Sequence, residues 1–270
     1  MNMEKLNRWI AKNAIAVYTA SVLPAFLIAI WAIRRWYGPW VLLIYLLLFG
    51  WIIGSSRFIF GRGSALLKAP VDTLMNACDP YPYLEEAETQ RSYSGNRSMK
   101  LGHITTLATA LLEVGDYDRM DALLTSTPEE TVRGAHPANQ VVYCGLAANI
   151  YARQKNLLEM ELWHDRLLTA YQKVKLQKHR AWLEPMMVSH HAAYRYARQE
   201  YAQGLQLLED FPVRTLRDGV VQSYSLAKFH LALNEKETAR EHLDFVIKNG
   251  NKLYVVTEAR ALLAKINSEE

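Results

Sequence analysis

Residues 107–124 read LATALLEVGDYDRMDALL, and this stretch decides the fold. Apolar residues recur at spacings of three and four on both sides of the pair Gly115-Asp116, which predicts two helices joined by a tight turn. The small side chain of Ala108 lets the partner helix approach closely, and Leu111 fills the space inside the hairpin. The stretch therefore predicts a helix–turn–helix unit.

The same arrangement recurs three times further along the chain. Each copy has small residues in its first helix, a larger residue three or four places later, and a turn beyond it. The copies contain Ala147-Ala148 with Tyr151, Ala192-Ala193 with Tyr196, and Leu226-Ala227 with His230. No alternating strand pattern follows Ser64. The sequence therefore predicts an all-α fold with helices near 65–78, 81–92, 98–114, 117–126, 138–154, 156–173, 180–199, 201–210, 217–233, 235–248 and 252–267.

These units resemble the tetratricopeptide repeat (TPR), a helical hairpin that stacks into a superhelix. The resemblance covers residues 98–267. Equivalent positions are separated by 40, 45 and 34 residues, whereas the family repeats at 34, and the longer units carry extra residues at 126–137 and 172–181. The resemblance implies a TPR-like right-handed α-solenoid, with a concave groove for a protein or peptide partner and a C-terminal capping helix.

Two charge-free apolar runs precede the repeats. Residues 13–33 lie between Lys12 and Arg34, and residues 36–56 lie between Arg35 and Arg57. About 20 apolar residues in a helix cross the roughly 30 Å hydrocarbon layer of a bilayer. We therefore expect residues 1–62 to form a two-span membrane anchor, residues 63–97 a juxtamembrane helical pair, and residues 98–270 the repeat domain. A cleaved signal peptide is the alternative interpretation of the first run.

The charge of the chain separates into two parts. Residues 1–62 hold seven Lys or Arg and one acid, whereas residues 63–270 hold 24 basic and 26 acidic residues. The larger part is mildly acidic, which argues against a nucleic-acid surface. Three Lys or Arg flank the first span, two lie in the turn and three follow the second span, which favours cytoplasmic termini and a cytoplasmic repeat domain. The two cysteines, far apart in sequence, suit a reducing compartment.

Motifs for chemistry are weak. His190 and His191 are adjacent and point about 100° apart on a helix, so they are poorly placed for one metal ion. Residues 225–228 match the S-x-x-K pattern of penicillin-recognising enzymes but lack its companion motifs. The basic stretch 173–180 is interpreted as a solvated helix end, with anionic lipid as an alternative. We predict no metal, no cofactor and no catalytic residue, and hence a protein that is not an enzyme.

The first helix of each repeat unit would line the concave groove. The candidate groove residues are Asn149, Arg153, His190, Tyr194, Arg198, Tyr224 and Lys228. Asn149 and Arg153 are four residues apart on one helix face, so an amide and a guanidinium could hold a peptide backbone or carboxylate together. The alternative is that these side chains are solvated, or that the tyrosines pack between repeats.

The sequence thus predicts a membrane-tethered scaffold that recruits a protein or peptide partner through a TPR-like groove. A membrane-bound peptide-sensing regulator and an accessory subunit of a membrane complex are the alternatives. An enzyme assembled from distant residues is a weaker alternative. A small channel subunit is another, because neither span contains an Asp, Glu, Lys, Arg or His residue. The oligomeric state stays open.

Overall fold

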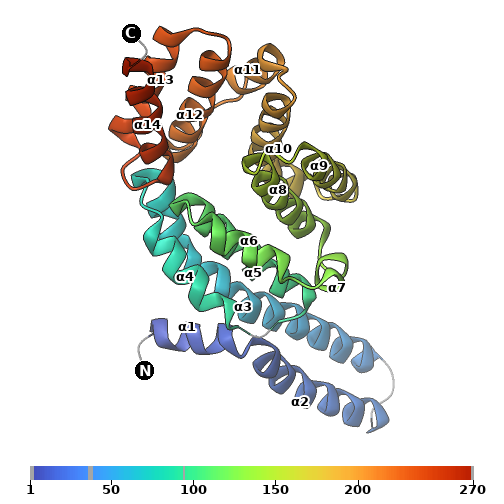
Figure 1. Ribbon diagram of the computed structural model, residues 1–270. Coiled ribbons are helices and arrows are strands. Elements are labelled where there is room, and N and C mark those ends of the chain that lie inside the picture. Colours follow the sequence, from blue (N-terminus) through green and yellow to red (C-terminus); the bar gives the residue numbers. More distant parts are fainter. Residues whose placement is uncertain (1–2, 36–38, 94, 269–270) are drawn as a thin grey trace.

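The computed structural model describes residues 3–35, 39–93 and 95–268, and the part it describes is helical without strands (Figure 1). The helices are α1 (Met3–Lys12), α2 (Ala14–Arg35), α3 (Pro39–Ala77), α4 (Tyr81–Arg91), α5 (Arg97–Val114), α6 (Tyr117–Thr125), α7 (Glu129–Arg133), α8 (Pro137–Arg153), α9 (Leu157–Gln172), α10 (Gln177–Ala197), α11 (Tyr201–Glu209), α12 (Leu216–Ala232), α13 (Lys236–Asn249) and α14 (Tyr254–Ser268). The all-α prediction is confirmed.

The turns between helices form as the sequence predicts. Gly115 ends α5 in the left-handed region at φ +78°, and the Asp116 side chain accepts the Arg119 N–H at the start of α6. The Asn156 side chain likewise accepts the Glu159 N–H and begins α9. These side chains satisfy backbone donors that a helix start leaves unpaired. The polar and glycine residues therefore fix the boundaries of the hairpins.

Helices α2 and α3 are long and apolar enough to cross a membrane by length and composition. The qualifying stretches are Ala14–Ala32 and Trp40–Ala77, and only 11% and 6% of their most apolar windows are buried in the protein. Large apolar side chains such as Leu27 and Leu47 are exposed on both helices. Residues 36–38, in the predicted turn and the start of the second span, lie outside the described residues.

Helix α3 is longer than the sequence predicts. It continues without a break from Pro39 to Ala77, so the expected separate helix 65–78 is its C-terminal part and the expected domain boundary at residue 62 falls inside it. The charge-free apolar run of the sequence ends at Arg57, but Leu67, Val71 and Leu74 pack into the main core and hold this part of α3 helical. Helices α1 and α7 were not expected from the sequence.

Consecutive helices pack in pairs, α5 with α6, α8 with α9, α10 with α11 and α12 with α13. The main core runs through these pairs, and a smaller cluster around Phe229 joins α10, α11 and α12. Helix α5 also packs against α8, and α8 against α10. This arrangement is compatible with a helical repeat.

The C-terminal helices lie beside the C-terminal end of α3 (Figure 1). The backbone N–H of Lys252 donates to the Cys78 carbonyl at 3.2 Å, and the Asn251 amide donates to the Ala77 carbonyl at 2.8 Å. Lys252 Nζ also lies 2.6 Å from a carboxylate oxygen of Asp79. We expected the last helix to cover the open end of a stack. The loop before α14 is bound to the C-terminal end of α3, and α14 packs against α5, α12 and α13, so the role of α14 as a cap stays a prediction.

Candidate functional site

A cleft of about 770 Å³ opens where α5, α8, α10, α12 and α14 converge, and we call it the central cleft. Its wall is rich in tyrosines and small residues, with four cations and two carboxylates among them. The residues that the following argument uses are Glu113 of α5, Arg153 of α8, Tyr196 of α10, Arg217, Tyr224 and Lys228 of α12, and Tyr254 and Glu258 of α14.

Arg153 holds α8 to α14 at the edge of the central cleft. Its Nη1 lies 2.9 Å from Oε1 of Glu258, and its guanidinium carbon lies 3.6 Å from the ring centroid of Tyr117. The Tyr224 hydroxyl donates to the other oxygen of Glu258. Glu258 therefore already has a cation and a phenol as partners, and Arg153 already has a carboxylate.

Arg217 and Glu113 form a buried ion pair between α12 and α5. The Arg217 guanidinium donates to Glu113, whose side chain is only 5% exposed, and Arg217 Nη1 lies 3.3 Å from Asp218. The Nε of Arg217 is buried without a hydrogen-bond partner among the described residues. A buried charge is tolerated only when it is paired, so each residue of this pair depends on the other.

Lys155 and Lys228 are the two cations of this wall for which the described residues supply no ion-pair partner, and of these Lys155 is exposed whereas Lys228 is half-buried. The Nζ of Lys228 lies 4.9 Å from the ring centroid of Tyr196 and 5.7 Å from that of Tyr224, distances at which ring faces attract a cation. Burial lowers the pKa of Lys228, and the negative charge of Glu258 opposes that shift. Lys228 is thus a half-buried positive charge that lies among aromatic rings and has no ion-pair partner among the described residues.

Four of the seven candidate groove residues line this cleft. Asn149 and Arg153 enter it from α8, and Tyr224 and Lys228 enter it from α12. The structure therefore brings together residues from two of the expected units, while Arg153 binds a carboxylate of the chain itself.

The other three candidates, His190 and Tyr194 on α10 and Arg198 directly after it, lie outside the central cleft. His190 is buried and its Nε2 lies 3.0 Å from Nδ1 of His164, on whose ring Tyr194 stacks with a centroid distance of 4.0 Å. Arg198 pairs with Glu161 at 2.7 Å and with Glu200 at 3.1 Å.

The reason for this difference is the rotation of α10. The residues of α10 that line the cleft are Ser189, Ala192, Ala193, Tyr196 and Ala197. This face differs by one residue, or about 100° around the helix, from the face that contains the three candidates. The expected face of α10 therefore turns toward α9 and the surface instead.

Sequence reasoning missed the cleft residues that come from distant parts of the chain. Glu113, Arg217 and Glu258 meet only because α12 and α14 pack back onto the first hairpin. One signal was present, since Glu113 sits within the apolar pattern of its helix, where an ionised side chain requires a partner. The position of that partner does not follow from helix periodicity.

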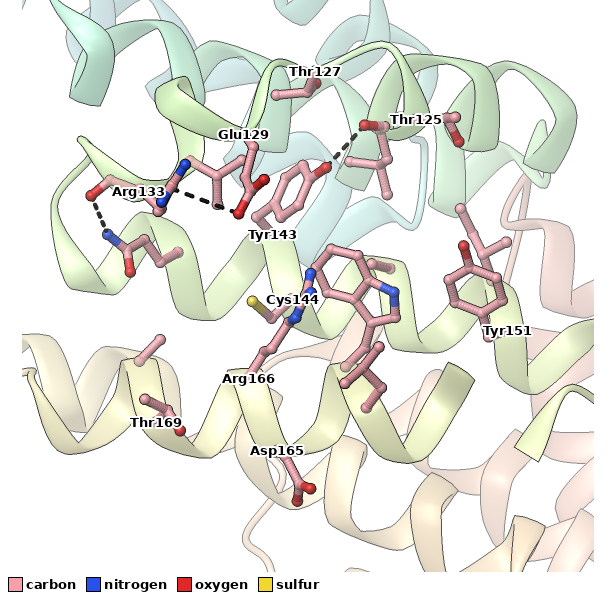
Figure 2. A pocket seen from close by; sticks show the side chains of 18 of the residues that line it. Thr125, Thr127, Glu129, Arg133, Tyr143, Cys144, Tyr151, Asp165, Arg166 and Thr169 are labelled. Atoms are coloured by element: carbon pink, nitrogen blue, oxygen red, sulfur yellow. Dashed lines mark hydrogen bonds and ion pairs between the residues drawn. The ribbon is translucent and has the colours of Figure 1, made fainter. Parts of the chain in front are cut away.

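A second cleft, of about 630 Å³, lies between α6, α7, α8 and α9 (Figure 2). Figure 2 shows Tyr143, Cys144 and Arg166 facing it. The Tyr143 hydroxyl donates to the Leu124 carbonyl at 2.8 Å, and Arg166 lies 4.7 Å from the ring centroid of Trp163. Burial raises the pKa of the Cys144 thiol to about 11, so it stays protonated at neutral pH.

The part of the chain that the structure describes holds no group of three His, Cys, Asp or Glu residues placed as metal ligands. No family model, no curated protein and no solved structure matches the chain. The class that the fold defines is therefore an all-helical protein with two helices that meet the length and hydropathy of membrane spans.

Proposed function

We propose that this protein is a membrane-tethered recruitment module that holds an acidic peptide segment of a partner protein in its central cleft. In this proposal the helix pairs form a TPR-like solenoid whose end returns to its beginning, and α2 and α3 form the anchor. The proposal includes no catalytic step and no cofactor. Lys228 is the observation that carries it.

Lys228 supports an acidic ligand because of its surroundings. A partly buried ammonium loses hydration, and two tyrosine rings replace only part of it. A ligand carboxylate would supply the missing counter-charge, and hydrogen bonds to charged groups are worth about 1.5–3 kcal/mol. The neighbouring Asn149 amide could bind the backbone of an extended peptide.

In this proposal the membrane anchor concentrates the bound partner protein at the bilayer. A partner held beside a bilayer meets other membrane components at a raised effective concentration. Helix α3 passes from exposed apolar residues such as Leu47 to core residues such as Leu74, so one rigid helix connects the proposed span to the domain. The Lys and Arg flanks favour a cytoplasmic domain, and we include that orientation in the proposal.

The test uses the full chain in nanodiscs and a library of peptides with and without acidic residues. We expect bound peptides to be enriched in Asp, Glu or a free C-terminal carboxylate. Lys228→Met keeps the length of the side chain but removes its charge, and should weaken binding of the acidic peptides about 10- to 150-fold. Lys248→Met, on the exposed side of α13, is the matched control and should change nothing.

A photo-crosslinker in place of Ser225, inside the central cleft, then locates the bound peptide. We expect crosslinking at Ser225 that unlabelled peptide prevents, and none from position 248. The proposed role of the cleft is refuted if the Lys228→Met variant binds acidic peptides as tightly as the unsubstituted protein does, and if neither protein prefers acidic to neutral peptides.

A further inference from the structure

Residues 172–183, between α9 and the first turns of α10, form a cationic segment with apolar side chains on its outside. The segment reads QKVKLQKHRAWL and contains no acid. Lys173, Lys175 and Lys178 are exposed, and no described residue forms an ion pair with them. Leu176 is 52% exposed and Trp182 is 62% exposed. The segment thus shows cationic and large apolar groups to the outside together, and we call it the basic loop.

Contacts between the inner side of the basic loop and the domain fix the conformation of the loop. Val174 is buried at 1% exposure, and Arg180 Nε donates to the Val174 carbonyl at 2.7 Å. The Arg180 guanidinium also lies over the Tyr171 ring, 5.6 Å from its centroid. Because these contacts hold the inner side of the basic loop against the domain, its outer side carries the three lysines, Leu176 and Trp182.

The basic loop lies at the end of the domain where α2 and α3 join it. A chain of contacts connects the two. Met99, in the first turn of α5, packs on the cluster of Ile10, Ala14 and Ile59 at the base of α2 and α3. The adjacent Ser98 accepts the backbone N–H of His136 at 3.1 Å.

From there the contacts continue into the basic loop. The ring of His136, at the start of α8, lies 5.0 Å from that of His179. Helices α5, α8 and α10 therefore all begin at this end. Figure 1 shows α7 and the start of α8 on the side of the domain that faces α2.

The same end gathers other positive charges. Arg62 donates to Asn7 at 2.9 Å, which brings α3 and α1 together at the base of the apolar helices. The charged side chains at this end include Lys5, Arg8, Lys12, Arg57, Arg62, Arg97 and Arg133, against Glu4, Glu86, Glu129 and Glu130. Residues 63–270 as a whole are mildly acidic, so the positive charge is concentrated toward the proposed bilayer.

We propose that the basic loop is a second membrane contact, which docks the domain on anionic lipid headgroups beside the spans. The lysines meet the headgroups, and Leu176 and Trp182 enter the interfacial layer, where tryptophan is favoured. Charge complementarity and continuity with the apolar surface of α2 and α3 select a lipid surface as the occupant. The inference rests on the membrane tether of the proposed function, and it adds a lipid-dependent orientation of the central cleft.

The experiment places a fluorophore on single introduced cysteines of the full chain in vesicles containing lipid-attached quenchers. Gln177→Cys reports on the basic loop, and Leu47→Cys reports on the proposed span. Gln203→Cys, exposed on α11 beyond the other end of α10, is the matched control. The two native cysteines are buried, so they compete little for the label.

We expect quenching at position 47 in all vesicles and none at position 203. At position 177 we expect quenching in phosphatidylcholine vesicles with about a third phosphatidylglycerol, and little in phosphatidylcholine alone. Raising the salt from about 0.1 to about 1 M shortens the screening length from about 10 to about 3 Å and should reverse it. Replacing the three lysines by alanine should lower the docked-to-undocked ratio about 100-fold, or about five-fold for each lysine.

The quenching results distinguish a failure of the docking inference from a failure of the membrane tether. Quenching at position 47 without quenching at 177 in anionic vesicles overturns the docking inference and leaves the tether standing, as does lysine-independent quenching at 177. Absence of quenching at position 47 overturns the tether itself, and the docking inference with it.

Discussion

Replacing Glu113 by glutamine should open the contact between α12 and α5. The Glu113 side chain is 5% exposed and accepts a hydrogen bond from the guanidinium of Arg217, and the Arg217 side chain is 24% exposed. Glutamine has nearly the same shape and keeps one oxygen as an acceptor, so the substitution removes the charge and leaves the packing. Arg217 would then be buried with only Asp218 to compensate it, at 3.3 Å.

The size of the effect follows from this geometry. Breaking a buried ion pair by removing one partner costs about 3–5 kcal/mol, because the remaining charge stays desolvated. Asp218 retains part of the compensation, and Arg217 is not fully enclosed, so we expect the lower end, about 3 kcal/mol. Removing both charges in the double variant Glu113→Gln, Arg217→Met should cost less than Glu113→Gln alone, since no unpaired charge remains.

The assay is urea unfolding of the helical domain in the full chain, held in detergent micelles. We expect a lower midpoint with an unchanged slope, which identifies a change in stability. A double-mutant cycle isolates the coupling between the two side chains. A loss below about 0.5 kcal/mol for Glu113→Gln, or full additivity in the cycle, would show that the pair does not hold α12 to α5.

Three further predictions concern the interior of the domain. In Gly204→Ala the new Cβ would lie 2.5 Å from two ring carbons of Phe229, so we expect a loss of about 1–3 kcal/mol in the same unfolding assay. Burial and neighbouring histidines lower the pKa of His190 to about 3. The contribution of His190 to stability is therefore present above about pH 6.5 and is lost as the pH falls. Between about pH 7.5 and 5.5 this group should lower the free energy of unfolding by about 1.4 kcal/mol. Burial raises the pKa of Cys78 and that of Cys144 to about 11, so maleimide should label both slowly at pH near 7 and rapidly in urea, as mass spectrometry will show.

Each of these predictions has its own control. Gly102→Ala places a Cβ no closer than 3.4 Å to any neighbour, so it should be neutral or stabilising in the interior of α5. His190→Gln should flatten the pH dependence of unfolding, and an unchanged slope in that variant would contradict the assignment to His190. Fast labelling of the folded protein at both native thiols would contradict their burial.

Local patterns predict the helices well because the residues that determine their boundaries are neighbours in sequence. Gly115 and Asp116 form their turn from backbone geometry and a single capping bond, and no distant residue is needed. The one large error, the division of α3, arises where that rule fails. Leu67 and Leu74 keep α3 helical through contacts with helices far along the chain.

The candidate site was only partly predictable for the same reason. Asn149 and Arg153 share a helix face, and periodicity finds that face. On α10 the residues that line the central cleft lie one position away from the candidates, and a weak apolar pattern around Pro185 does not indicate that rotation. Glu258 reaches Arg153 only through the return of α14, and no local pattern indicates that the chain closes on itself.

The closure and the proposed tether meet on a single helix. At 1.5 Å per residue the 39 residues of α3 extend roughly 58 Å, and a bilayer core uses about 30 Å of that length. The remainder carries Leu74 into the core and ends where Asn251 and Lys252 bind the carbonyls of Ala77 and Cys78. The loop before α14 is therefore attached to the same rigid element that would enter the membrane. Since Glu258 of α14 forms one wall of the central cleft, this attachment would hold the cleft at a fixed height above the bilayer and limit which partner segments can reach it.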